Sequence, residues 1–208
     1  MGNYEYIVAS LPDITTGWKF GEKGPQDYIE EIVSLCSKKD NELIDFLLSG
    51  YMDENLNEEF YIKALSHKNR FIREFFRFDM NVRNAKVTYL NKALDRPAGK
   101  DVLTFSEDAP EAVLMTVEAE FEEADDLETI LNSGDILTRE RGIDDLVWEK
   151  ISNLTTFNYF DIEVILGFIA KLNIVARWYK LDEQTGREMF KRLVDEVRGT
   201  FKGVEYNG

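Results

Sequence analysis

The sequence is poor in the residues that build disulfides, zinc sites and histidine-dependent catalytic centres. Its 208 residues include one cysteine and one histidine. An internal disulfide needs two cysteines, and one cysteine with one histidine makes no zinc site without carboxylates. No HExxH or CxxC motif occurs, so we expect no metal and no cofactor. We interpret Cys36 as a buried thiol, which fits a reducing cytoplasm.

Recognisable catalytic motifs are also missing. His67 lies in the polar segment LSHKNR, and its spacing places no nucleophile or orienting acid beside it. We interpret it as an exposed capping or linker residue. The glycine-rich segment at 17–24, GWKFGEKG, is followed by Pro25 and Gln26 instead of the lysine and hydroxyl residue of a phosphate-binding loop. The pattern therefore favours a protein that is not an enzyme.

Positive charge is scarce. The chain has 25 Lys and Arg against 40 Asp and Glu, a formal net charge of -15. Phosphates would repel such a surface and no basic stripe stands out, so we expect no nucleic-acid partner. Adsorption to an anionic lipid surface is disfavoured for the same reason. Basic protein surfaces are the partners that this charge favours, mainly through the association rate.

No segment is predicted to enter a membrane. The N-terminal segment MGNYEYIVASLPDI lacks the basic region that precedes the apolar run of a signal peptide. The most apolar stretch, residues 162–179, contains Glu163, Lys171 and Arg177, and such charges are costly at the centre of a bilayer. We expect a buried helix there, and a cytoplasmic protein without direct membrane insertion.

Apolar periodicity predicts an all-α fold, a multi-helix bundle with a long central helix and a short extended N-terminal segment at 4–11. One helical domain over residues 1–208 is expected, and a division into two lobes near 97–112 is the alternative. In the first half we expect helices over about 26–37, from a cap at Asp40 to a stop at Gly50, over 57–66 starting at Asn57, and over 69–95, ended by Arg96-Pro97. In the second half we expect one helix capped by Asp135, one over 162–180 capped by Asp161, and a last one capped by Asp182.

The long predicted helix at 69–95 combines a wide apolar surface with charge. Apolar residues cover about half of its circumference, which predicts contacts with two or more neighbouring helices. Asp79 and Arg83 fall inside this arc at i and i+4, so we expect a structural ion pair that is at least partly buried. A catalytic role for Asp79 is the alternative, but no partner for it is visible.

Residues 118–128, EAEFEEADDLE, are strongly acidic. The run lacks the alternating spacing and the glycine of an EF-hand loop, so we interpret it as a solvated face anchored by residues such as Phe121 and Leu127. The candidate interaction surface combines this stretch with the polar side of the long helix, and it comprises Asn84, Asn91, Glu118, Glu122 and Asp125.

Three segments together resemble one bacterial family. They are YEYIVASLP, FIREFFRFDMNVRNAKV, and GIDDLVWEKISNLTTFNYFDIEVILGFIAKLNIVARW. That family is encoded beside the genes of V-type (V/A-type) ATPases, and its pattern is similar to the C-type stalk component of these enzymes, which is named d in eukaryotes. The shared positions are Tyr4, Tyr6 and 9–12, then Phe75, Phe78, Asn81, Arg83 and Asn84, then Ala170, Lys171 and Arg177.

The resemblance implies a non-catalytic subunit or accessory of a V/A-type rotary ATPase. Such a protein couples the central stalk to the membrane proteolipid ring, and so lies peripherally on the cytoplasmic side of the membrane. The C-type stalk component is considerably longer and consists of three similar helical parts, of which this chain has room for about two. An unrelated helical protein-binding or regulatory module is the alternative.

Overall fold

The computed structural model describes residues 3–118 and 121–201, with the backbone alone for Glu118 and for 183–201. This part of the chain is helical without any strand, as the periodicity predicts. Its elements are α1 (Tyr4–Ser10), α2 (Pro25–Leu35), α3 (Lys38–Ser49), the short 3-10 helix η1 (Asp53–Asn55), α4 (Glu58–Leu65), α5 (Arg70–Ala93), α6 (Glu111–Glu118), α7 (Ala124–Leu131), α8 (Ile136–Thr155) and α9 (Ile162–Phe201).

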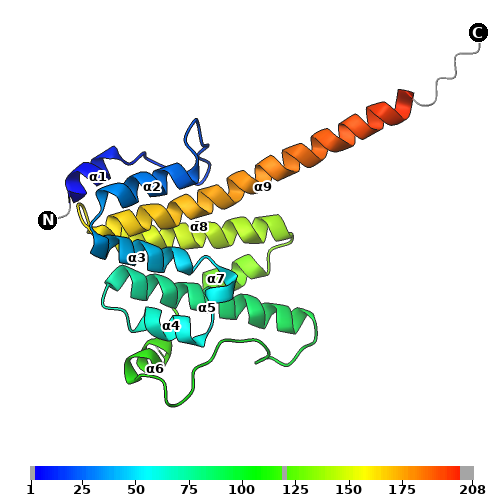
Figure 1. Cartoon of the computed structure of the whole chain (residues 1–208). Helices are drawn as coiled ribbons and strands as arrows, with labels where there is room; N and C mark the ends of the chain where they lie inside the picture. The colour runs from blue at the N-terminus through cyan, green and yellow to red at the C-terminus, as the bar shows by residue number, and fades with distance from the viewer. Residues whose placement is uncertain (1–2, 119–120, 202–208) are drawn as a thin grey trace, which may run out of the picture.

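The helices pack side by side in a bundle around α5 and α9 (Figure 1). Helix α5 contacts α4, α7, α8 and α9, and α9 contacts α1, α2, α3, α5 and α8. Residues 165–170 of α9 are all buried, because neighbours surround this part of the helix. The central position predicted for the long helix is therefore shared by α5 and α9. Past the bundle, α9 continues beyond the ends of its neighbours.

Two hydrophobic clusters explain the wide apolar surface of α5. Its Phe71, Phe75 and Phe76 belong to the main core, which includes residues from Ile7 to Trp178. Phe78 and Val82 belong to a second cluster, together with Leu127 and Leu131 of α7 and Ile143 of α8. One helix thus serves two cores, which requires apolar residues on two of its faces. A division into lobes near 97–112 stays a prediction.

Side-chain caps set most of the helix starts that the sequence indicates. Asn57, Asn69 and Asp135 each accept a hydrogen bond from a backbone N–H in the first turn of α4, α5 and α8. Asp161 accepts from the backbone N–H groups of Glu163 and Val164 at the start of α9. The prediction for Asp40 is wrong, because Ser37 caps α3 and Asp40 sits in its first turn as the reciprocal partner of a capping box.

The extended segment predicted at 4–11 is wrong, since residues 4–10 form α1. Tyr4, Ile7, Val8 and Leu11 follow a helical spacing, and Ile7 is fully buried in the main core. A run this short matches a strand or a helix about equally well from its pattern. Packing against α9 selects the helix.

The last two predicted helices are one helix. Asp182, predicted to cap a separate helix, lies inside α9, which runs without a break from Ile162 to Phe201. The reason is local, because no proline interrupts the sequence there and an acidic residue is tolerated within a helix. None of the helices in the described part of the chain has an apolar stretch long enough to cross a membrane.

Among the glycines whose surroundings the structure describes, the closest approach occurs where α3 ends. A Cβ atom built on Gly50 would lie 2.3 Å from Cε1 of Phe76 and 3.0 Å from Cζ of Phe60. The chain therefore needs glycine at this position for packing against α4 and α5, and its φ of -73° shows that backbone freedom is not the reason.

We expect Gly50→Ala to lower the melting temperature. The added methyl group overpacks the Phe60–Phe76 contact, which typically costs about 1–3 kcal/mol and corresponds to a loss of roughly 2–12 °C for a chain of this size. The matched control is Gly99→Ala, where no atom lies within 4 Å of the added Cβ. Thermal unfolding followed by circular dichroism checks this, and an equal change in both variants would contradict it.

Candidate functional site

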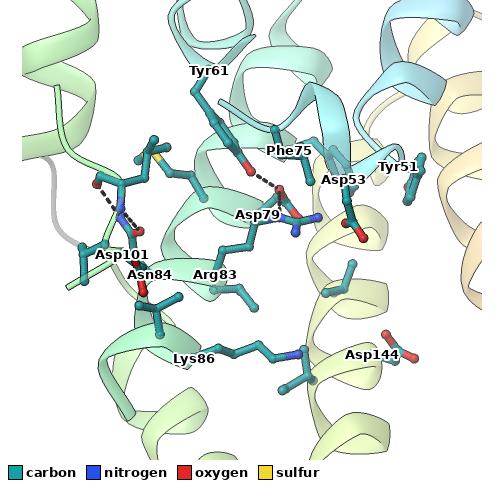
Figure 2. Close-up of a pocket in the computed structure, with 18 of the residues that line it drawn as sticks. Tyr51, Asp53, Tyr61, Phe75, Asp79, Arg83, Asn84, Lys86, Asp101 and Asp144 are labelled. Atoms are coloured by element: carbon teal, nitrogen blue, oxygen red, sulfur yellow. Dashed lines mark hydrogen bonds and ion pairs between the residues drawn. The ribbon is translucent and has the colours of Figure 1, made fainter. Parts of the chain in front are cut away.

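One cavity, named the main cavity for its position between the three longest helices, lies between α5, α8 and α9 and has a volume of about 770 Å³ (Figure 2). The segment around η1 and the loop at 101–103 complete its wall. Its apolar lining is contributed by Leu56, Phe75, Met80, Val82, Val87, Leu90, Val102, Leu103, Ile143, Val147 and Ile174. Several charged side chains share this space, so the cavity brings polar groups together at the junction of the three longest helices.

The first polar cluster joins α4 to α5. The hydroxyl of Tyr61 donates a hydrogen bond of 2.7 Å to Oδ2 of Asp79, and Nε of Arg83 donates one of 2.8 Å to the same oxygen (Figure 2). Burial of Tyr61 and the charge of Asp79 raise the pKa of the Tyr61 hydroxyl. The ion pair between Asp79 and Arg83 is half-buried. The phenol therefore acts as a neutral donor that fixes the carboxylate on the cavity wall.

The second polar cluster joins α5, α8 and α9. Asp144 of α8 is 6% exposed and accepts hydrogen bonds from Arg177 and from the indole Nε1 of Trp178, both on α9. Burial raises the pKa of Asp144, and the two donors act in the opposite direction. Glu140, one turn before Asp144, lies 3.0 Å from Nζ of Lys86 on α5 and 3.9 Å from Nη1 of Arg177.

The cations of this cavity are paired within the protein. Each cation on its wall, namely Arg83, Lys86 and Arg177, lies beside a carboxylate from the protein itself. No cysteine or histidine lines the cavity, and the described residues contain no group of three side chains arranged to hold a metal ion. A general base needs a free carboxylate or imidazole facing a reacting group. The three cations are paired, while Asp53 and Asp101 also line the cavity and form no ion pair within the described part of the chain.

The structure separates the residues of the candidate interaction surface. Asn91 is 2% exposed, and its amide donates to the carbonyl oxygens of Ala98 and Lys100. The half-buried amide of Asn84 exchanges two hydrogen bonds with the backbone of Leu103. These two asparagines therefore hold the loop after α5 against that helix. Their assignment to a docking surface is corrected, because their polar groups are used inside the protein.

The acidic stretch lies on a different part of the molecule. Glu122 and Asp125 are exposed, while Glu123 forms an ion pair with Lys150 of α8. Leu127 anchors α7 in the second hydrophobic cluster, as the sequence predicts. The side chain of Glu118 lies outside the described residues. Glu122 and Asp125 stay candidates for an interaction surface.

Sequence reasoning missed the cluster of Asp144 and Trp178. Both residues belong to the segment that carries the family resemblance, and so does Arg177, but Asp144 lies 33 and 34 positions from its two partners along the chain. The same segment contains a second contact between helices, in which Nζ of Lys171 lies 4.9 Å from the ring centroid of Trp148. A helical wheel shows which residues share a face of one helix, but it does not predict which residues of another helix will contact that face.

A family model matches residues 51–200. The chain belongs to the DUF2764 family, described as a protein of unknown function. The DUF2764 region contains every residue that lines the main cavity, from Tyr51 to Arg177. Helices α1, α2 and α3 precede it. No curated protein and no solved structure matches the chain.

A small polar cluster outside the DUF2764 region fixes α1 to α3. The hydroxyl of Tyr4 donates a hydrogen bond of 2.8 Å to the buried carboxylate of Asp40. Cys36, in the turn before α3, is half-buried and has no disulfide partner. Burial and the nearby Asp40 raise the pKa of the Cys36 thiol to about 11.

We expect Asp144→Ala to destabilise the protein by about 1–3 kcal/mol. The variant leaves the buried indole N–H of Trp178 without an acceptor, and an unsatisfied buried donor costs this amount. Arg177 is half-exposed and regains water, so it adds little. The matched control is Asp145→Ala, an exposed neighbour whose loss is worth less than about 0.5 kcal/mol. Urea unfolding midpoints measure both, and equal shifts would refute the bracing role of Asp144.

We expect Cys36 in the native protein to react with iodoacetamide roughly a hundredfold more slowly at pH 8 than in the urea-unfolded chain. The reason is that only the thiolate reacts, and a pKa of about 11 leaves little thiolate at pH 8. The raised pKa also links stability to pH. The neutral thiol contributes fully to the free energy of unfolding below the pKa that it has in the unfolded chain, and this contribution is lost as the pH rises toward 11. Mass spectrometry of timed samples gives the rates, and equal rates would contradict the burial of the thiol.

Proposed function

We propose that this chain is a non-catalytic subunit or accessory of a V/A-type rotary ATPase that couples the central stalk to the membrane proteolipid ring. The observation that carries the proposal is the cross-bracing of α5, α8 and α9 by Lys86, Glu140, Asp144 and Arg177. A part that transmits torque must resist bending and sliding of its helices. Charges paired between three helices contribute to that resistance, because any relative shift separates half-buried partners from one another and from the buried Asp144.

The residues that carry the family resemblance support the same proposal. Lys171 and Arg177 of the late motif contact α8 through Trp148 and Asp144. In the middle motif, Arg83 is paired with Asp79, and Asn84 holds the following loop. These motif residues therefore act in positioning helices and loops, which is the task expected of an adaptor. No motif residue stands as a free acid, base or nucleophile beside another in the main cavity.

The chemistry of the cavity supports the non-catalytic part of the proposal. Its cations are neutralised by carboxylates of the same chain, so none is free to hold a phosphate of ATP. Location at the cytoplasmic side of a membrane is part of the proposal, with contact through the protein components of the complex. The alternative is an unrelated helical protein-binding or regulatory module, which has the same bracing but a different partner.

We expect the tagged chain to retain both stalk proteins and the proteolipid from detergent-solubilised native membranes. Mass spectrometry of the eluate identifies them, and a tagged acidic helical protein of unrelated sequence is the control. A stable coupling element needs a total buried interface above roughly 1,200 Å², so the association should survive extended washing. Recovery of an unrelated protein, with the ATPase components in the flow-through, would favour the alternative.

A second arm tests coupling itself. Deletion of the gene from native cells should leave ATP hydrolysis by the soluble part of the enzyme, while ATP-driven ion uptake into membrane vesicles is lost. The coupling role would be overturned if ion uptake in the deletion strain equals that of the parent strain and returning the gene does not increase it.

A further inference from the structure

The turn between α8 and α9, residues 156–161, exposes three aromatic side chains within four positions. Phe157 is 89% exposed, Tyr159 71% and Phe160 55%. An aromatic residue offers roughly 150–250 Å² when buried, so these fractions expose on the order of 400 Å². The largest apolar patch on a typical monomer has about this size and is often functional. This aromatic turn is therefore a strong candidate for a contact surface.

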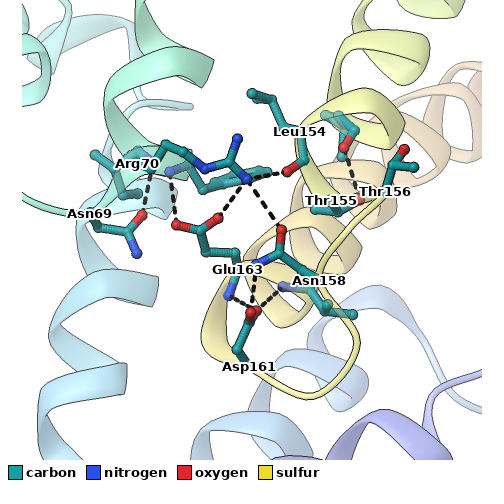
Figure 3. Close-up of polar contacts among 12 residues, drawn as sticks. Asn69, Arg70, Leu154, Thr155, Thr156, Asn158, Asp161 and Glu163 are labelled. Atoms are coloured by element: carbon teal, nitrogen blue, oxygen red, sulfur yellow. Dashed lines mark hydrogen bonds and ion pairs between the residues drawn. The ribbon is translucent and has the colours of Figure 1, made fainter.

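Polar contacts hold the backbone of the aromatic turn in place (Figure 3). Nη2 of Arg70, at the start of α5, donates to the carbonyl of Leu154 at 2.6 Å, to Oδ1 of Asn158 at 3.2 Å and to Glu163 at 2.9 Å. Asp161 accepts from the side chain of Asn158 and from the first backbone N–H groups of α9. The turn is thus fixed at both ends, while its three aromatic side chains stay largely open to solvent.

Unpaired lysines lie at the same end of the bundle. The starts of α3 and α5 lie beside the α8–α9 turn (Figure 1), and one hollow there is lined by Lys39, Lys68 and Ile162. Lys38, Lys39 and Lys68 are exposed, and none forms an ion pair within the described part of the chain. Glu42 is an exposed acid lining that hollow.

Two further carboxylates at this end are not exposed. Asp40 also lines the hollow but is buried and hydrogen-bonded to Tyr4, and Asp161 of the turn is half-buried. Lysines therefore outnumber exposed carboxylates among these residues.

We infer that the aromatic turn and the three lysines form a docking surface for a protein partner that offers an apolar groove flanked by carboxylates. Aromatic anchors in a groove dominate binding energy at such contacts, and flanking charges of opposite sign set specificity and association rate. A turn that is fixed before binding loses less conformational entropy when it docks. The inference does not depend on the proposed function.

The fixed turn and the total charge favour a protein over a lipid bilayer. A fluid bilayer adapts to the side chains that enter it, so it gains little from a rigid turn. A net charge of -15 also opposes approach to anionic lipid. A protein groove has a defined shape, and only such a surface benefits from the contacts of Arg70 and Asp161 that fix the turn.

The test places a photo-crosslinking phenylalanine analogue at position 157 of the full chain in its native cells. We expect one discrete cross-linked protein whose cross-linked segment is apolar and flanked by Asp or Glu. The combined variant Lys38→Glu, Lys39→Glu and Lys68→Glu should lower the yield about tenfold without changing the melting temperature, because like charges then meet across the contact. The control places the analogue at Ile136, which is 76% exposed at the start of α8.

Four outcomes would overturn the inference. They are cross-links to lipid only, cross-links only to a second copy of this chain, equal yields of the same product from positions 157 and 136, and no product at position 157. A cross-linked partner with the expected groove that is no part of an ATPase would leave the inference standing and remove the proposed function. A partner that belongs to the ATPase supports both.

Discussion

The fold depends on one constraint, which is that residues 165–170 of α9 are apolar on all sides of the helix. Residues 165–170 are buried in succession, so no face of this segment is left for water. A helix of this kind must be covered all round. Helices α1, α2, α3, α5 and α8 supply the cover, and each can do so because one of its own faces is apolar. The arrangement of the bundle follows from this need.

Buried or half-buried carboxylates then fix how the helices sit against one another. Asp40 joins α3 to α1, Asp79 joins α5 to α4, Asp144 joins α8 to α9, and Glu163 joins α9 to the start of α5. A carboxylate removed from water needs donors, and in each case a donor comes from another helix. Hydrophobic burial alone permits sliding between helices, whereas these hydrogen bonds select one register.

The same contacts divide the surface into regions with different chemistry. The main cavity contains three cations, each of which is paired with a carboxylate of the same chain. At one end of the bundle the aromatic turn and three lysines face solvent without partners of their own in the described part of the chain. Glu122 and Asp125, on the side of α7, give the opposite charge. The described surface therefore offers an aromatic region with exposed lysines and a separate acidic region.

The sequence by itself determined the helical class and most helix starts, because caps such as Asn57, Asn69, Asp135 and Asp161 act on backbone groups two or three residues away. It also placed Asp79 and Arg83 within reach of each other, since four positions equal about one helical turn. Only the tertiary structure decided that residues 4–10 are helical, that Asn91 is buried, and that Asp144 meets Arg177 and Trp178. The physical reason is distance along the chain. These features depend on contacts with other elements, and no local pattern records which elements will meet.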